Sequence, residues 1–293
     1  MVIRAVILCT LMSLGLRGQE VTFRSDSRLV VLNVSLFDKD GKIVNNVPRN
    51  AFTVYENGQK QEVTVFKQED VPISLGLIID NSASMTEKRD QVASAALALV
   101  KASNAQDEVF IINFNEAAVL TKEFTNDIKD LENALRSIDS KGETAMRDAL
   151  LLGIEHLRHH GKRDKKVLLV VTDGEDNSSM ETEEHLVQIA QQNDVIIYAV
   201  GLLGAEEASS AARAKKQLNE LTLETGGRAW YPGDAAEIAG IAPEIAHEIR
   251  NQYVLAYTPS NLAMDGTFRK IRVEVNATDV AVRTRSGYYA PRP

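Results

Sequence analysis

Cysteine is almost absent from this chain of 293 residues, which contains only Cys9. Cys9 lies inside an apolar N-terminal run, and the preceding Leu8 is not the small residue that a lipoprotein signal requires. If that run is removed on export, the remaining chain has no thiol and forms neither a disulfide framework nor a cysteine metal site. The protein must then be held by its hydrophobic core, and a chain of this length can build one.

An excess of basic residues is also missing. The chain has 33 Lys and Arg against 41 Asp and Glu, a formal charge of −8. Nucleic-acid binding favours a basic footprint, so we expect no nucleic-acid partner. The hydrophobic content of 44% and charged content of 25% are ordinary for a soluble globular protein.

No apolar run is long enough to span a bilayer comfortably, including the N-terminal one. That run, residues 5–16, follows Arg4 and ends before Arg17 and Gly18. A basic start, a short apolar core and a small residue near the exit resemble a secretory signal peptide. We therefore predict a signal peptide over residues 1–18, an exported protein (periplasmic or extracellular) and no transmembrane span in the mature chain. The alternative is a buried N-terminal strand or helix.

Catalytic motifs are lacking as well. No G-x-S-x-G sequence or phosphate-binding glycine loop occurs, and no nucleophile is paired with a base. His156 and His160 have the spacing of helical metal ligands but lack the glutamate of H-E-x-x-H. They end a predicted helix, where basic side chains interact favourably with the helix dipole. We expect no enzyme activity.

The two ends of the chain have β character. Residues 51–56 alternate with period two, and Asn57-Gly58 is a strong hairpin signal. The expected strands are 29–37, 51–56 and 61–66 near the N-terminus, and 253–257, 268–275 and 280–285 near the C-terminus. Each set is too small to be stable alone. We therefore expect the N-terminal segment 19–72 and the C-terminal segment 253–293 to pack together as a small antiparallel β-sandwich.

Strands alternate with helices between these ends, over residues 73–252. Such alternation predicts a doubly wound, mostly parallel, Rossmann-like α/β sheet. The expected strands are 74–80, 108–115, 118–124 (an antiparallel partner of the preceding strand), 166–173, 195–201 and 228–231. The expected helices are 87–103, 125–138, 145–160, 182–192, 206–224 and 235–252, the last interrupted at Pro243.

Polar side chains follow directly on the first strand of the α/β part. The apolar run 75–79 ends at Asp80, followed by Ser82 and Ser84. Ligands of open α/β sheets bind at the carboxyl ends of strands. Carboxylate and hydroxyl oxygens suit a hard cation such as Mg²⁺. The alternative is a serine-rich turn that begins the next helix.

Two later segments belong to the same edge of the predicted sheet. One contains Thr144, in the loop before helix 145–160, and the other contains Asp173, at the end of strand 166–173. With the Asp80 motif, this ordered set resembles the von Willebrand factor A domain and its metal-ion-dependent adhesion site, over roughly residues 73–252. The segments 34–41, 51–58 and 285–290 are similar to those of a family of exported bacterial proteins with related A domains.

The resemblance implies a set of metal ligands. Asp80, Ser82 and Ser84 would be primary ligands, Thr144 would coordinate when a partner is engaged, and Asp173 would act through water. The implied ion is Mg²⁺, or Mn²⁺ or Ca²⁺, and a Glu or Asp carboxylate of a protein partner would complete its coordination shell.

Two further residues near these motifs are carboxylates. Glu143 stands where the family often has glycine, and we expect it to face solvent. We expect Asp148 to be a cap or surface partner rather than a ligand. The leading hypothesis is a metal-dependent protein-binding or cell-adhesion module, and the alternative is a structural or assembly component in which the ion mainly stabilises the fold.

Overall fold

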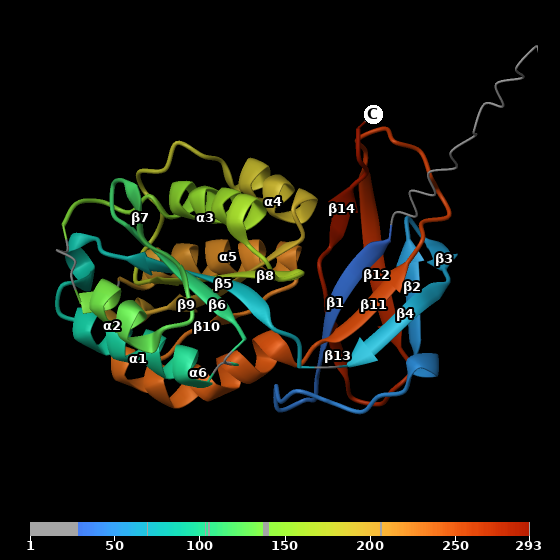
Figure 1. The fold of residues 1–293 in the computed structure, drawn as a ribbon, viewed down its shortest axis with the longest axis horizontal. Helices are drawn as coiled ribbons and strands as arrows, with labels where there is room; N and C mark the ends of the chain where they lie inside the picture. The colour runs from blue at the N-terminus through green and yellow to red at the C-terminus, as the bar shows by residue number, and fades with distance from the viewer. Residues whose placement is uncertain are drawn as a thin grey trace, which may run out of the picture.

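The computed structural model describes residues 29–68, 70–102, 104, 106–136, 141–205 and 207–292. The predicted signal peptide, with Cys9, lies outside these residues. An α/β body and a β body lie side by side (Figure 1). Within the described part of the chain, no helix combines the length and apolar character needed to cross a membrane.

The α/β body contains a six-stranded sheet in the order β10-β9-β8-β5-β6-β7. All neighbouring pairs are parallel except β6 and β7. The strands are β5 (Ile73–Asp80), β6 (Glu108–Phe114), β7 (Ala118–Thr125), β8 (Lys165–Thr172), β9 (Val195–Gly201) and β10 (Ala229–Trp230). This arrangement confirms the predicted fold class, including the antiparallel partner at one edge.

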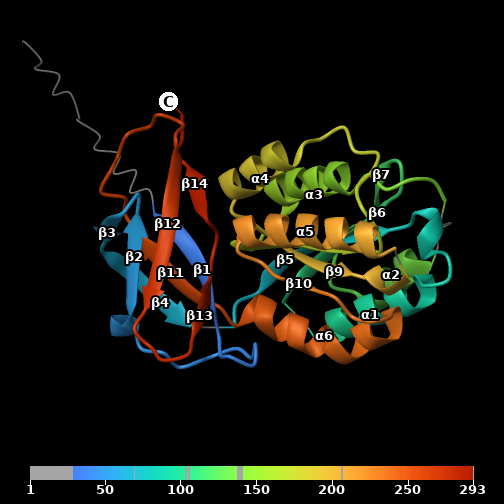
Figure 2. The same ribbon diagram turned by 180° about the vertical axis from the view of Figure 1, so that it is seen from behind.

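Helices cover both faces of this sheet, as Figures 1 and 2 show. One face packs against α1 (Arg89–Ala102), α2 (Ile128–Arg136) and α6 (Ala235–Arg250). The other packs against α3 (Met146–His160), α4 (Glu183–Gln192) and α5 (Ala208–Thr225). Burial on both sides explains why the central strands are continuously apolar. Gly76 lies in the middle of β5, where an added Cβ would approach Phe110 Cζ to 2.4 Å.

The β body is a sandwich of two antiparallel sheets, ordered β13-β1-β11-β4 and β14-β12-β2-β3. Each sheet combines strands that precede and follow the α/β body. The strands are β1 (Val30–Phe37), β2 (Phe52–Glu56), β3 (Gln59–Gln61), β4 (Val63–Gln68), β11 (Tyr253–Tyr257), β12 (Phe268–Val275), β13 (Ala281–Arg283) and β14 (Gly287–Tyr289). The two ends of the sequence thus share one apolar core.

The sequence predicts that strand 61–66 completes the hairpin at Asn57-Gly58, and this pairing is wrong although most of the strand exists as β4. Asn57 and Gly58 have φ angles of 48° and 82°, as the predicted tight turn requires. However, the return strand of this hairpin is the short β3, whereas β4 pairs with β11 in the other sheet. The chain changes sheets at Glu62, and this change completes both sheets. The predicted strand 280–285 is likewise shorter, and β14 was not predicted.

The predicted interruption at Pro243 is also wrong, because α6 continues through it. Proline has no N–H to donate to the carbonyl four residues earlier, which is that of Ala239. Both residues are exposed, so water can bond that carbonyl.

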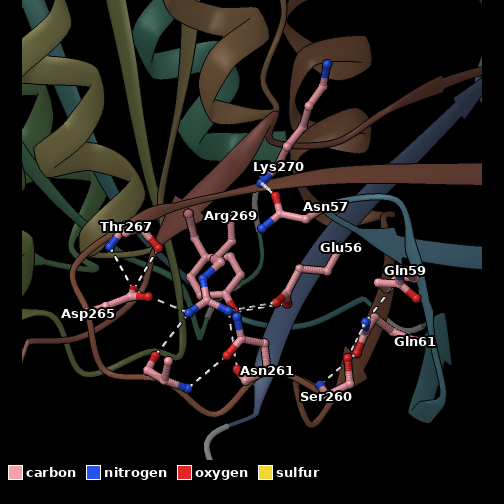
Figure 3. Close-up of polar contacts among 12 residues, drawn as sticks. Glu56, Asn57, Gln59, Gln61, Ser260, Asn261, Asp265, Thr267, Arg269 and Lys270 are labelled. Atoms are coloured by element: carbon pink, nitrogen blue, oxygen red, sulfur yellow. Dashed lines mark hydrogen bonds and ion pairs between the residues drawn. The ribbon is translucent and has the colours of Figure 1, made fainter.

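A buried ion pair joins two neighbouring strands of one sheet, and a tyrosine hydroxyl of the other sheet donates to it (Figure 3). Arg269 of β12 lies 3.4 Å from Glu56 of β2, and their side chains are 1% and 2% exposed. The hydroxyls of Tyr257 and Tyr288 donate to Glu56 Oε2 at 2.8 and 3.0 Å. Arg269 also donates to the carbonyl of Asn261 at 3.3 Å. Four strands and the loop before β12 are therefore joined by one buried polar network.

The chain passes between the bodies twice, before β5 and after α6. Gln252 Nε2 donates to Ser35 Oγ at 2.9 Å across this junction. Beside it, Lys165 is buried and donates to the carbonyl of Ile249, near the end of α6. Because β5 starts at the junction and rises roughly 3.3 Å per residue, its carboxyl end lies about 25 Å further from the sandwich.

Candidate metal centre

The candidate centre lies at the carboxyl ends of two adjacent central strands. Asp80 is the last residue of β5, and Asp173 follows the last residue of β8. The parallel register pairs Ile79 with Val171, which places Asp80 level with Thr172. This is the edge of the sheet at which the sequence predicted the site.

Asp80 is buried, with 1% of its surface exposed. Its Oδ1 accepts a hydrogen bond from the backbone N–H of Ser82 at 2.8 Å, and its Oδ2 accepts one from Thr172 Oγ1 at 2.6 Å. Burial raises the pKa of Asp80 from 3.8 to about 6, against the lowering effect of these hydrogen bonds, and the charge of Asp173 adds to the rise. An ionised Asp80 is therefore a carboxylate that a nearby cation would stabilise.

The two serines lie in a short turn beside Asp80. A 3₁₀ turn, Ala83–Met85, follows Ser82, and buried Met85 anchors it to the core. Ser82 Oγ and Ser84 Oγ are 3.1 Å apart, and Ser84 Oγ donates to Asp173 Oδ1 at 2.8 Å. Asp80, Ser82, Ser84 and Asp173 thus form a continuous hydrogen-bonded chain.

Asp173 has a second partner that the sequence analysis missed. Its side chain has no exposed surface, and its Oδ2 lies 2.5 Å from Lys88 Nζ. Lys88 is four residues after Ser84 and immediately precedes α1. The sequence shows only a lysine one turn beyond the motif, and this position alone does not distinguish a buried partner from a solvated residue.

Thr144 reaches the same edge on the loop between α2 and α3. The backbone N–H of Lys141 donates to the carbonyl of Asn81 at 2.9 Å, and that of Ala83 donates to the carbonyl of Gly142 at 3.3 Å. Thr144 is 5% exposed, and its backbone is bonded to Asn177. Among the residues that the structure describes, it shares no hydrogen bond with the other four predicted ligands.

The loop after Asp173 is fastened to the start of α3. Asp176 accepts hydrogen bonds from the backbone N–H of Arg147 and from Ser179 Oγ, both at 2.7 Å. Asp148 accepts from the backbone N–H groups of Met180 and Glu181 at 3.1 and 2.9 Å. Asp148 therefore anchors this loop. Glu143, on the neighbouring loop, is exposed.

The donor set suits a hard divalent cation. Over the described ranges, no group of three or more His, Cys, Asp or Glu side chains could hold a metal ion. The candidate centre instead combines two carboxylates with hydroxyl oxygens, and oxygen donors are the ligands preferred by Mg²⁺, Mn²⁺ and Ca²⁺. The connected Asp80, Ser82, Ser84 and Asp173 side chains fit such an ion.

The histidines on α3 have a different environment. His156 is 8% exposed, and its ring stacks on Phe124 at 5.1 Å and lies 4.6 Å from Phe110. Burial lowers the pKa of His156, and the neighbouring Glu123 opposes this effect. His156 therefore contributes to packing between α3 and the sheet.

Comparison with known proteins gives matches to the α/β body. Residues 75–175 match the von Willebrand factor type A domain family. Integrin alpha-11 from Mus musculus is 36% identical over 109 residues, which covers 34% of this chain and 9% of the integrin. The uncharacterized protein sll0103 from Synechocystis sp. is 30% identical over 109 residues, which covers 36% of this chain and 26% of that protein. The chain thus spans only a small part of these relatives.

Solved structures share the fold at low sequence identity. A von Willebrand factor type A protein from Catenulispora acidiphila has a TM-score of 0.54 and 15% identity, covering 92% of this chain and 64% of that one. Proximal thread matrix protein 1 from the mussel byssus, solved with a zinc-occupied MIDAS motif, has a TM-score of 0.52 and 15% identity, covering 66% of this chain and 49% of that one. The matched segment shows that the α/β body carries a von Willebrand factor type A domain, and the solved structures share its fold.

Proposed function

We propose that this protein is a divalent-cation-dependent protein-binding module that acts outside the cytoplasm. Its α/β domain would bind a carboxylate of a protein partner through an ion held at the carboxyl edge of the sheet. The proposed ligands are Asp80, Ser82, Ser84, Thr144 and Asp173. The observation that carries the proposal is the hydrogen-bonded chain that joins four of these residues around the buried Asp80.

The chemistry of these residues supports a binding role. The bound ion supplies an electrophilic position at which a partner's carboxylate can complete the coordination shell. Ser82, Ser84 and Thr144 offer neutral oxygens, so few protein charges offset the charge of the ion. Thr172 holds one oxygen of Asp80, and this fixes the direction of the carboxylate. We propose Mg²⁺ as the ion, with Mn²⁺ or Ca²⁺ as alternatives.

The arrangement of the two bodies also supports this role. The centre lies at the end of β5 that points away from the sandwich, where a large partner has access. We assign the binding function to residues 73–252 and a supporting function to the sandwich formed by residues 19–72 and 253–293. The leader-like segment 1–18 is the basis for placing the protein outside the cytoplasm.

A second candidate function is structural, with the ion mainly stabilising the fold. One observation favours it: burial disfavours the ionised form of Asp80, and a bound cation would relieve this cost. The two functions can be distinguished by the need for a partner, because only the binding function requires a carboxylate from another protein.

Peptide selection tests this difference. A displayed library of random peptides is selected on the immobilised protein in Mg²⁺ and eluted with EDTA. We expect the selected peptides to require one Asp or Glu, and to lose binding when it is changed to Asn or Gln. Asp80→Ala should abolish binding, whereas the matched control Asp90→Ala, at an exposed carboxylate of α1, should retain it. Binding that persists in EDTA contradicts the proposal, and stabilisation by Mg²⁺ without any such peptide favours the structural function.

A further inference from the structure

Lys88 is the only positively charged group bonded to the candidate ligands within the described part of the chain. Its Nζ lies 2.5 Å from Asp173 Oδ2, and the other oxygen of Asp173 accepts a hydrogen bond from Ser84. The carbonyl of Lys88 accepts from the backbone N–H of Val92, so Lys88 belongs to the first turn that leads into α1. Its backbone position is therefore fixed beside the centre.

This ion pair differs from an ordinary surface pair. Exposed pairs contribute little because water and salt screen both charges. Here the Asp173 side chain has no exposed surface and the Lys88 side chain is 22% exposed. Removing the cation from such a pair leaves a buried carboxylate without a counter-charge, which is strongly unfavourable.

We propose that Lys88 is an internal counter-ion of the metal centre, whose ammonium group balances Asp173 in the metal-free protein and is displaced when a divalent ion binds. Lys88 thereby sets the ion concentration at which the centre fills. This inference rests on the proposed function, because it concerns the same ligands.

Electrostatics requires the displacement. A divalent ion held by the candidate ligands would lie near the Lys88 ammonium group, because Lys88 contacts Asp173, and like charges at short range in a poorly solvated site repel strongly. Lys88 is on a flexible four-carbon stem and is partly exposed, so its charge can move to solvent while its backbone stays in place. The free energy of the lost ion pair is subtracted from that of ion binding, which weakens the affinity.

Calorimetric titration with MgCl₂ tests the proposal on the chain without its predicted leader. The variant Lys88→Met removes the internal charge and keeps an unbranched apolar stem. Lys101→Met is the matched control, because Lys101 is an exposed lysine at the other end of the same helix. We expect Lys88→Met to bind Mg²⁺ about tenfold more tightly than the wild type, a change of about 1.4 kcal/mol. Lys101→Met should leave the affinity unchanged.

Thermal unfolding in EDTA separates this role from simple structural support. We expect Lys88→Met to lower the Tm of the metal-free protein and to increase the rise in Tm produced by Mg²⁺. A residue with only a structural role would lower both metal-free and metal-bound stability and leave the Mg²⁺ affinity unchanged. If Lys88→Met does not fold, Lys88→Gln gives the same readout, since it keeps a hydrogen-bond donor without the charge.

The outcomes distinguish this inference from the proposed function. Equal Mg²⁺ affinities for the wild type and Lys88→Met, with binding lost in Asp80→Ala, would overturn the role of Lys88 and leave the metal centre standing. Absence of Mg²⁺ binding in the wild type and in every Lys88 variant would overturn both. Tighter Mg²⁺ binding by Lys88→Met, with the affinity of Lys101→Met unchanged, supports both the role of Lys88 and the metal centre.

Discussion

The substitution Asp80→Asn should stabilise the metal-free protein at neutral pH. Burial raises the pKa of Asp80 from 3.8 to about 6, and this difference corresponds to about 3 kcal/mol between its two protonation states. Asparagine has the same shape and no charge. Its Oδ1 can accept from the backbone N–H of Ser82, and its Nδ2 can donate to Thr172 Oγ1, so both hydrogen-bond positions remain occupied.

The sign of the pH dependence follows from linkage. Because the folded-state pKa is raised, the folded protein binds the Asp80 proton more tightly than the unfolded chain. That contribution to stability is fully present below about pH 4 and is lost as the pH rises through about 6. In EDTA at pH 8, the free energy of unfolding of Asp80→Asn should exceed that of the wild type by about 3 kcal/mol. This difference should become smaller as the pH falls towards 4.

Urea unfolding in EDTA at several pH values measures this gap. Other titrating groups affect both proteins, so the difference between them isolates Asp80. The same variant should lose Mg²⁺ binding, as expected where a functional site is maintained at a cost in stability. An Asp80→Asn protein that is less stable than the wild type at pH 8, or a gap that does not depend on pH, would refute this reasoning.

Three further predictions concern the scaffold. Burial lowers the pKa of Lys165 to about 7, so the free energy of unfolding of the wild type relative to Lys165→Met should rise by about 3.5 kcal/mol between pH 7 and pH 10. A difference in urea unfolding that does not change with pH would contradict this. Gly76→Ala should destabilise by about 3 kcal/mol or more, since its Cβ would meet the Phe110 ring; unchanged urea unfolding would refute the tight packing. Arg269→Met should lower the free energy of unfolding by about 3 to 5 kcal/mol, because it leaves the buried Glu56 without a counter-charge. A variant that unfolds at the wild-type Tm would rule this out.

The order of elements in the α/β body could be predicted from the sequence because its strands are buried on both faces. Runs such as 75–79 are continuously apolar, and the helices between them have regular apolar spacing. The end of α5 was predictable from Gly226, which has a φ angle of +88° and closes the helix. At these positions the local sequence was sufficient to predict the secondary structure.

Long-range pairing could not be predicted in the same way. Nothing in residues 59–68 marks Glu62 as the point where the chain leaves one sheet for the other, because both β3 and β4 are compatible with strand structure. Continuation of α6 through Pro243 depends on the exposure of that side of the helix, which is a tertiary property. The buried Arg269–Glu56 pair depends on strands more than 200 residues apart in the sequence.

The candidate centre also combines residues that the local sequence predicts with a contact that it does not. Asp80, Ser82 and Ser84 belong to one local motif, so their convergence follows from a strand end and a turn. Asp173 could be assigned to the same edge because parallel strands end together. The Lys88–Asp173 ion pair could not be inferred, because a lysine before a helix is usually a solvated residue.

The most direct test of the account is a calorimetric titration of Mg²⁺ into residues 19–293, beside the Asp80→Ala variant. The account predicts saturable binding to the wild type that is lost in the variant, because Asp80 is the buried carboxylate at the middle of the candidate centre. Absence of binding to the wild type, or equal binding to both proteins, would contradict it.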